Sequence, residues 1–232
     1  MKELFLSFKY SFSSGTGELE GERYFQTVFI DIYAEDADNE GDSVLIGKSC
    51  VKVILLSQAL ENQYDLAELA DMNRELGQIL DLEPESDLDI FKQSIIEKYP
   101  ECCMNNNVCV LDRLVLIPEY RGYGISKKVI KDTIFHFSTA CGLFVIYPFP
   151  LQLEGEHCIC EDPWEDKNWY KGLEKNEKKA FSKLTSYFQK LGFEKIKQRC
   201  PMQGQCRLWR LRFLPECRGC RPPASSSASG GG

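Results

Sequence analysis

Recurring apolar residues predict a run of β-strands in the first quarter of the chain. Between residues 24 and 33 they fall at Phe25, Val28, Ile30 and Ile32. A period of two places such side chains on one face of a strand. The pattern predicts antiparallel strands over residues 4–12, 24–33 and 44–56, with a hairpin joining the last two. The connection 34–42 is acidic and turn-rich, which fits either a solvated loop or a rim that attracts cations.

Between residues 57 and 99, the spacing of apolar residues changes to that of a helix. Apolar residues recur there at spacings of three and four, in two stripes: Leu60, Tyr64, Ala67 and Leu69, then Leu88, Phe91, Ile95 and Ile96. Such spacing puts the side chains on one side of a helix. Proline interrupts helical hydrogen bonding, so the helical pattern is expected to break at Pro84 and Pro100.

The second half of the chain alternates strands and helices. The pattern predicts strands over residues 108–117, 143–147, 193–197 and 205–213, and helices over 124–140 and 174–191. Gly192 is placed to act as the C-cap of the second helix. The segment 148–172 carries two of the three tryptophans of the chain, and long connections of this kind often have a function.

Composition and charge narrow the classes of function. The chain has 232 residues, of which 43% are hydrophobic, enough for a core in one large or two small domains. Its net charge of −7 argues against a general nucleic-acid binder, which needs a basic face, and is compatible with a cationic substrate. No run approaches the roughly 20 apolar residues of a membrane span, and polar residues follow the first apolar ones directly. We therefore expect a cytoplasmic protein with no nucleic-acid or membrane partner.

Eleven cysteines are an odd number in a long chain without a visible export signal, which favours reduced thiols over a disulfide scaffold. Cys158 with Cys160, and Cys217 with Cys220, raise the alternative of a four-ligand zinc site. The first pair is one residue too close for the usual half-site, so we expect free thiols and no metal. Residues 215–232 are expected to form a cysteine-containing tail that is either disordered or, in part, an expression remnant.

An apolar strand runs into a glycine turn that opens a helix over residues 111–126. A strand that ends in such a turn aims backbone N–H groups and the positive end of the helix dipole at one point beyond the strand. Gly122 and Gly124 lack a Cβ, so the backbone can approach a ligand closely. The segment predicts an anion site of the kind that binds phosphate.

Two segments resemble the GCN5-related N-acetyltransferase (GNAT) superfamily. The family's acyl-CoA pyrophosphate loop, Leu-x-Leu-x-Pro-x-x-Arg-Gly-x-Gly-x-(Gly/Ala), is matched by Leu114, Leu116, Pro118, Arg121, Gly122 and Gly124, with Ser126 as a departure. The helix end at residues 187–193 is similar to the family's Leu-Tyr-x-Lys-Leu-Gly-Phe. The resemblance covers residues 108–213. Family members usually place two helices right after the first strand, so here either the helices have moved or the early strands are misassigned.

The resemblance implies an α/β (α+β) fold with a mixed, mostly antiparallel sheet flanked by helices. It implies one domain over residues 1–214, with a divergent half 1–107 and an acyl-CoA-binding half 108–214. The implied activity is transfer of an acetyl group from acetyl-CoA to a primary amine of a small molecule or protein. The alternative is a non-catalytic acyl-CoA-binding or interaction module. A homodimer is a further expectation. The residues implied to hold the donor are Leu116, Ile117, Arg121, Gly122, Tyr123, Gly124, Ile125 and Ser126.

The implied chemistry needs a base, because an amine with a pKa of about 10 must lose a proton before it attacks. Asp112 lies in the strand before the loop, where several family members use a carboxylate. Its alternative role is a surface ion pair beside Arg113. His157, in the long connection, is a second candidate base, and His136 is expected to be structural.

The departing thiolate needs a proton, which many family members supply from a tyrosine that corresponds to Phe188 here. Tyr187 lies about 100° away around the helix, so it serves only if the helix shifts by one residue. Tyr147 and solvent are the other candidates. Ser126 either adds a hydroxyl to the donor loop or is an ordinary serine at a helix N-terminus.

Overall fold

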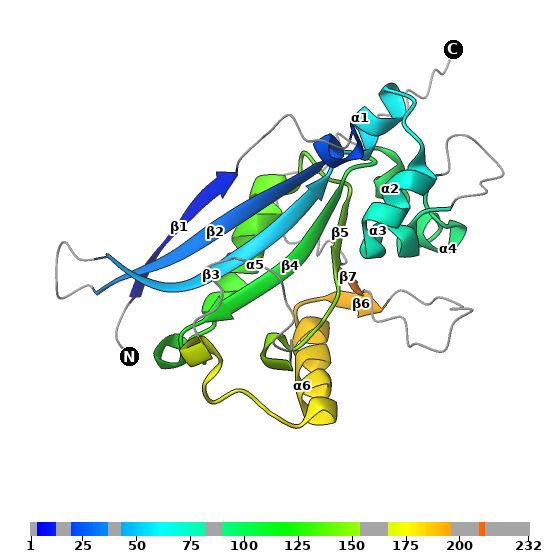
Figure 1. Ribbon diagram of the computed structural model, residues 1–232. Coiled ribbons are helices and arrows are strands. Elements are labelled where there is room, and N and C mark those ends of the chain that lie inside the picture. Colours follow the sequence, from blue (N-terminus) through cyan, green and yellow to red (C-terminus); the bar gives the residue numbers. More distant parts are fainter. Residues whose placement is uncertain are drawn as a thin grey trace, which may run out of the picture.

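Seven strands form one sheet in the computed structural model, which describes residues 4–12, 20–36, 43–81, 90–153, 167–195 and 209–211 (Figure 1). They are β1 (Leu4–Phe12), β2 (Phe25–Asp36), β3 (Ser43–Ile54), β4 (Val108–Leu116), β5 (Leu143–Ile146), β6 (Phe193–Lys195) and β7 (Trp209–Leu211). Their order in the sheet is β1-β2-β3-β4-β5-β7-β6. Only β4 and β5 pair in parallel among these strands. The predicted mixed, mostly antiparallel sheet is confirmed.

The first three strands lie where the alternating pattern predicts them. β1 matches in both bounds, and β2 and β3 form the predicted hairpin. β2 extends to Asp36 because Glu35 still pairs with Ser43 across the hairpin. β3 ends at Ile54 because a helix begins at Leu56. The early strands are therefore correctly assigned, and the helices follow them.

Four short helices occupy the described part of the stretch for which two helical stripes were predicted. They are α1 (Leu56–Glu61), α2 (Leu66–Met72), α3 (Arg74–Ile79) and α4 (Gln93–Ile96). Asn73 separates α2 from α3, because its side chain accepts a hydrogen bond from the Leu76 N–H at 2.8 Å and so caps α3. The Asp65 carboxylate caps α2 in the same way through the Ala67 N–H. The predicted break at Pro84 lies outside the described residues.

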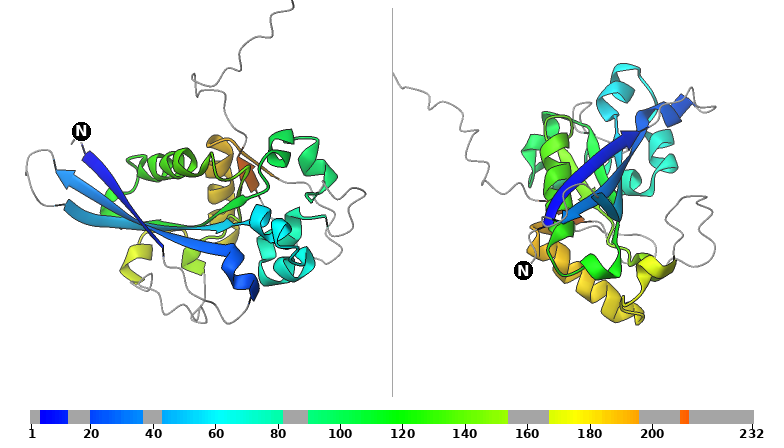
Figure 2. Two further views of the ribbon diagram at one scale, coloured as in Figure 1. Left: turned by 90° about the horizontal axis from the view of Figure 1, so that it is seen from above. Right: turned by 90° about the vertical axis from the view of Figure 1, so that its left-hand side faces the viewer.

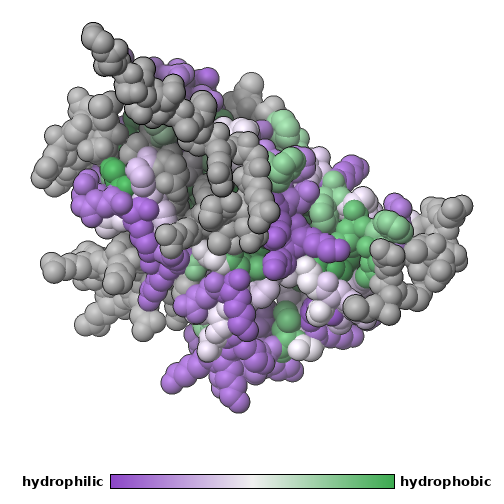
Figure 3. All heavy atoms as spheres, turned by 180° about the vertical axis from the view of Figure 1, so that it is seen from behind, coloured by the Kyte–Doolittle hydropathy of each residue, from purple (hydrophilic) through white to green (hydrophobic). Residues whose placement is uncertain are grey.

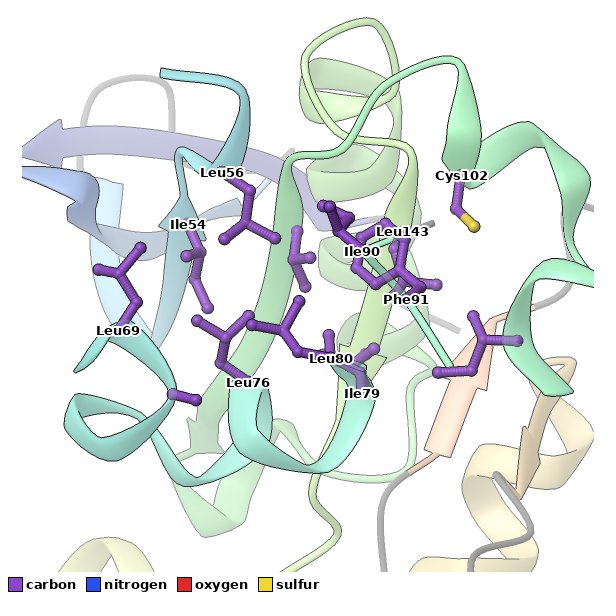
Figure 4. Packing of buried hydrophobic residues seen from close by; sticks show 14 of the residues in the cluster. Ile54, Leu56, Leu69, Leu76, Ile79, Leu80, Ile90, Phe91, Cys102 and Leu143 are labelled. Carbon is purple, nitrogen blue, oxygen red and sulfur yellow. The ribbon is translucent and has the colours of Figure 1, made fainter. Parts of the chain in front are cut away.

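These short helices bury the largest apolar cluster against one end of the sheet. Figure 4 shows Ile54 and Leu143 of the strands beside Leu56, Leu69 and Leu76 of the helices. Full burial of an aliphatic side chain of this size stabilises by about 1.5–3 kcal/mol. The cluster is therefore enough to hold α1–α3 on the sheet despite their length.

α5 (Ile125–Phe137) covers the other face of the sheet (Figure 2). Alternate residues of β4 divide between the two faces, since Val108 and Val110 join the cluster under α1–α3 while Cys109 and Leu111 pack with α5. The helix is shorter than predicted because a turn follows it, in which the Cys141 N–H donates to the Phe137 carbonyl.

α6 (Glu177–Lys190) ends one residue before the predicted end. Its C-cap is Leu191 rather than Gly192, which follows in a left-handed conformation at φ 94°. α6 starts three residues later than predicted because Asn176 accepts a hydrogen bond from the Lys179 N–H and caps it. The helix leads into β6, so its last turn lies next to the sheet (Figure 1).

Five 3₁₀ turns complete the described structure: η1 (Glu20–Tyr24), η2 (Pro100–Cys103), η3 (Pro118–Tyr120), η4 (Leu151–Leu153) and η5 (Lys167–Tyr170). η4 and η5 lie on the face of the sheet opposite α5 (Figure 2). Leu151, Trp169 and Tyr170 pack there against Cys50 of β3 and Val115 of β4. The sheet is thus covered on this face by two separate groups of short elements.

The surface mixes polar and apolar side chains. Figure 3 shows green apolar groups among purple polar ones on the side seen from behind. Phe5, Phe12 and Phe135 are exposed large apolar side chains. Within the described ranges, no helix combines the length and apolar character that a membrane crossing requires.

Candidate functional site

β4 and β5 pair along only half of β4 and then diverge (Figure 1). Their parallel pairing runs from Val108 with Leu143 to Leu111 with Ile146, where β5 ends. β4 continues to Leu116, and on its other edge it remains paired with β3. One edge of β4 beyond Leu111 therefore faces a gap in the sheet.

A β-bulge at Asp112 marks the start of this gap. β3 pairs Val51 with Leu111 and the preceding Cys50 with Arg113, so Asp112 is the extra residue on β4. A bulge bends its strand and redirects the side chains that follow. The bulge thus accounts for the turn of β4 away from β5.

A cavity of about 450 Å³ fills the gap and is lined from both faces of the sheet. Val129 and Thr133 line it from α5, while Val115 and Tyr170 line it from the face that carries η5. The cavity is therefore bordered by side chains from both faces of the sheet.

The glycine turn adopts the conformation that the sequence predicts. Gly122 and Gly124 have positive φ angles of 85° and 73°, and no atom lies within 4 Å of the position that a Cβ would take on either. Gly124 is the N-cap of α5 and, as a glycine, has no side chain with which to cap the helix. The start of α5 thus keeps its amides free of a capping side chain from the N-cap residue, which suits an anion site.

The cavity brings together some of the predicted site residues. Asp112, Leu116, Arg121, Ser126, Tyr147 and Tyr187 line it. Other predicted donor ligands do not, since Ile125 is buried in the core under α5 and Tyr123 is exposed at the turn. Ile117 packs beside the same core. His157 lies outside the described residues.

The Arg121 guanidinium is engaged by backbone carbonyls. Its Nε donates to Leu116 O at 3.0 Å, one Nη donates to Lys171 O at 2.6 Å, and the other donates to Trp169 O. Burial lowers the pKa of Arg121, although the nearby Glu119 opposes this shift. The predicted role of this side chain as a charge on the donor stays a prediction.

Tyr187 and Phe188 of α6 both line the cavity, and Phe188 is the more deeply buried of the two. The Tyr187 hydroxyl lies 2.7 Å from Ser126 Oγ on α5, so a hydrogen bond links α6 to the start of α5. Phe188 contacts Phe193 in the cluster under α5. Burial raises the pKa of Tyr187, and the hydrogen bond with Ser126 lowers it. In α6 the tyrosine is therefore residue 187, one residue before the position at which the family's pattern has it.

Asp112 forms an ion pair with Lys52 of β3, with 3.2 Å between Nζ and Oδ2. Burial lowers the pKa of Lys52, but the charge and hydrogen bond of Asp112, helped by Glu75, outweigh it and leave that pKa raised. The ion pair expected beside Arg113 therefore involves Lys52. Its signal in the sequence is a lysine between two valines, Val51 and Val53, in β3.

Further polar contacts around the cavity were not predicted. Gln152 Nε2 donates to Glu174 O at 2.9 Å, and the Glu174 carboxylate pairs with Lys183 of α6 at 3.0 Å. Ser49 donates its hydroxyl to the Arg113 carbonyl at 2.7 Å beside the bulge. These contacts join segments far apart in the chain.

His136 takes part in a group of contacts between α5 and the edge strand β1. Its Nε2 lies 3.6 Å from Asp132 Oδ2, and the Tyr10 hydroxyl of β1 donates to the same oxygen at 2.7 Å. The Tyr10 and His136 rings also meet edge to face. This arrangement agrees with the expected structural role of His136.

Among the described residues, no three potential metal-ligating side chains lie together. The side chains of Cys50, Cys102, Cys109 and Cys141 are buried thiols. The two cysteine pairs considered for zinc lie outside the described residues. No protein-family model, curated protein or solved structure matches the chain.

Proposed function

We propose that the chain is an acyl-CoA-dependent N-acetyltransferase, which transfers the acetyl group of acetyl-CoA to a primary amine. The observation that carries this proposal is the gap between β4 and β5, which opens at the Asp112 bulge. The cavity in this gap is lined from both faces of the sheet. A cavity bordered by side chains of both faces suits a reaction in which two substrates approach from opposite sides.

The donor fits on the side of α5. The N-cap residue of this helix is a glycine without a side chain, and the amides that follow it suit the pyrophosphate of coenzyme A. The amide-bearing arm of coenzyme A can follow the edge of β4 that faces the gap, by hydrogen bonds of the kind that join strands. The resemblance to the GNAT superfamily supports the same placement.

The reaction forms a bond between the amine nitrogen and the thioester carbon, breaks the carbon–sulfur bond and leaves a thiolate that takes up a proton. A backbone N–H near Leu116 is suited to the oxygen on which charge develops, a contribution of about 3 kcal/mol. Asp112 is the described candidate to accept the proton of the amine. Tyr187, which lines the same cavity, is the candidate to protonate the thiolate.

The alternative is a module that binds acyl-CoA without turnover. Two observations favour it. Lys52 forms an ion pair with the Asp112 carboxylate, which is the candidate base, and a buried phenylalanine, Phe188, stands where the family has a tyrosine. Both alternatives use the same donor site, so they differ only in the chemistry at the gap.

A binding titration and a thiol-release assay separate these alternatives. Coenzyme A is titrated by calorimetry, and thiol release from acetyl-CoA is measured with spermidine, kanamycin and lysine. We expect binding, and release of thiol with at least one amine. Binding without release on any amine would leave only the module. A chain that does not bind coenzyme A would overturn both.

We further propose that the protein acts in the cytoplasm, where acetyl-CoA is available. The thiols of Cys109 and Cys141 support this proposal, because an oxidising compartment favours disulfides. Fractionation of cells that express the chain, with a cytoplasmic marker enzyme as the reference, tests it.

A further inference from the structure

Arg121 joins two segments that are far apart in the sequence. The residue follows η3 in the donor loop, and its guanidinium reaches the end of its own strand at Leu116 and the η5 segment at Trp169 and Lys171. Each of its three nitrogens donates to a different carbonyl. The side chain that the sequence assigns to the donor therefore also holds the opposite side of the cavity.

The segment held by Arg121 forms part of the cavity wall. Tyr170, Gly172 and Leu173 line the cavity on the face opposite α5. Trp169 and Tyr170 pack on Cys50 and Val115, so the segment rests on the sheet through side chains as well. In the proposed function, the amine acceptor enters the cavity from this side.

We propose that Arg121 is a positioning residue that fixes the acceptor side of the site, and so controls how the amine binds more than how coenzyme A binds. This inference rests on the proposed function. The planar guanidinium is suited to the task, because its five N–H donors have fixed directions and can bridge several carbonyls at once. A lysine has a single nitrogen and cannot span the three carbonyls.

Hydrogen exchange tests the contact without any need for turnover. In Arg121→Ala, we expect faster amide exchange in peptides that cover residues 167–173, because hydrogen bonds to charged donors are among the stronger ones. Peptides from β2 and β3 serve as the internal reference. Unchanged exchange in residues 167–173 would overturn the proposal, whether or not the chain binds coenzyme A.

Kinetics test the positioning role with the fastest amine among spermidine, kanamycin and lysine. We expect Arg121→Ala to raise the KM for this amine by about tenfold and to change the Kd for coenzyme A by less than about threefold. Free guanidinium ion should restore part of the loss in Arg121→Ala. Arg121→Lys should remain impaired.

Lys9→Ala provides the matched control for loss of a positive charge. Lys9 is exposed on β1, at the edge of the sheet, and does not line the cavity. We expect it to change neither constant by more than about twofold, since exposed charges contribute little. If Arg121→Ala instead weakens coenzyme A binding and leaves the KM for the amine unchanged, Arg121 acts on the donor and the proposal fails. Wild-type protein without coenzyme A binding would refute the proposed function by itself.

Discussion

The two sides of the cavity are built in different ways. On the α5 side, the glycine turn and the helix are contiguous in sequence, and α5 packs its apolar stripe on the sheet along its length. On the opposite side, η4 and η5 are single turns. Arg121 holds the η5 segment, and η4 is joined through its own Gln152 to the Glu174 carbonyl. The first side is a regular element, whereas the second is an assembly of short pieces.

This difference suggests a division of labour. A helix N-terminus next to a glycine turn binds an anion through its backbone, so the side chains around it have little influence on what is bound. A wall of short turns presents mainly side chains, and its shape depends on a few hydrogen bonds. We therefore expect substitutions on the α5 side to act on the donor, and those on the η5 side to act on the acceptor.

The largest effect should come from a negative charge in the glycine turn. Gly124→Asp places a carboxylate beside the proposed pyrophosphate, and we expect coenzyme A binding to weaken by more than about a hundredfold, since apposed like charges cost several kcal/mol. Calorimetry measures the loss, and circular dichroism checks that the fold remains.

Gly124→Asn is the control that separates charge from backbone strain. Asparagine tolerates the left-handed conformation that Gly124 adopts at φ 73°. It has the size of aspartate without the charge. Equal losses in the two variants would show that strain and bulk, rather than repulsion of a phosphate, explain the effect. Unchanged affinity in both would refute the donor site.

The next largest effect should come from a substitution of Asp112, which lies where the gap between β4 and β5 begins. If Asp112 accepts the amine proton, Asp112→Asn should lower kcat by about a hundredfold, and most strongly at low pH, where the amine is fully protonated. Rates measured from pH 6 to about pH 10 test this expectation, the upper limit lying near the pKa of a free amine. Lys52→Met breaks the same ion pair and keeps the carboxylate, so it controls for loss of the pair. A loss that is equal at every pH would point to water or to His157.

Local features of this site could be predicted from the sequence because neighbouring residues determine them. Gly192 takes a left-handed conformation one residue after the C-cap of α6, next to its predicted place, and β1 has both predicted bounds. In each case the decisive information lies within a few residues. The order of strands and helices followed from the same short-range patterns.

Long-range contacts could not be predicted in the same way. Arg121 and Lys171 are 50 residues apart, and the approach of Lys52 to Asp112 depends on the register of β3 and β4 across a bulge. The orientation of Tyr187 depends on the rotation of α6 about its axis, which packing against the sheet decides. A pattern of residue types specifies none of these.

A smaller effect on kcat is expected when the hydrogen bond between Tyr187 of α6 and Ser126 of α5 is removed. Tyr187→Phe should lower kcat by about tenfold if its phenol protonates the thiolate, since solvent can replace it in part. In wild-type protein, kcat should fall as the pH rises through the pKa of Tyr187. The hydrogen bond with Ser126 lowers that pKa, so in Ser126→Ala the fall should move to higher pH.

The measurement is the dependence of kcat on pH in the three proteins, with Tyr33→Phe as a control tyrosine on β2. Carbon-13 labelling of the tyrosine rings gives a second readout that needs no substrate, because it follows the Tyr187 phenol directly. If Ser126→Ala weakens coenzyme A binding and leaves the phenol unchanged, Ser126 belongs to the donor site alone.

The smallest effect concerns the attachment of α5 to β1. Tyr10→Phe removes the hydrogen bond to Asp132, and we expect a loss of about 1 kcal/mol in the free energy of unfolding, with no change in the KM for the amine. Burial, followed by this hydrogen bond, raises the pKa of Tyr10 above its usual value. Its stabilising contribution is therefore complete below about pH 10, the pKa of an unfolded tyrosine, and falls as the pH rises further. Urea denaturation at neutral and at alkaline pH tests this, since the difference between wild type and Tyr10→Phe should shrink at alkaline pH. An altered KM in Tyr10→Phe would mean that the α5 side also shapes the acceptor site, and would remove the distinction between the two sides.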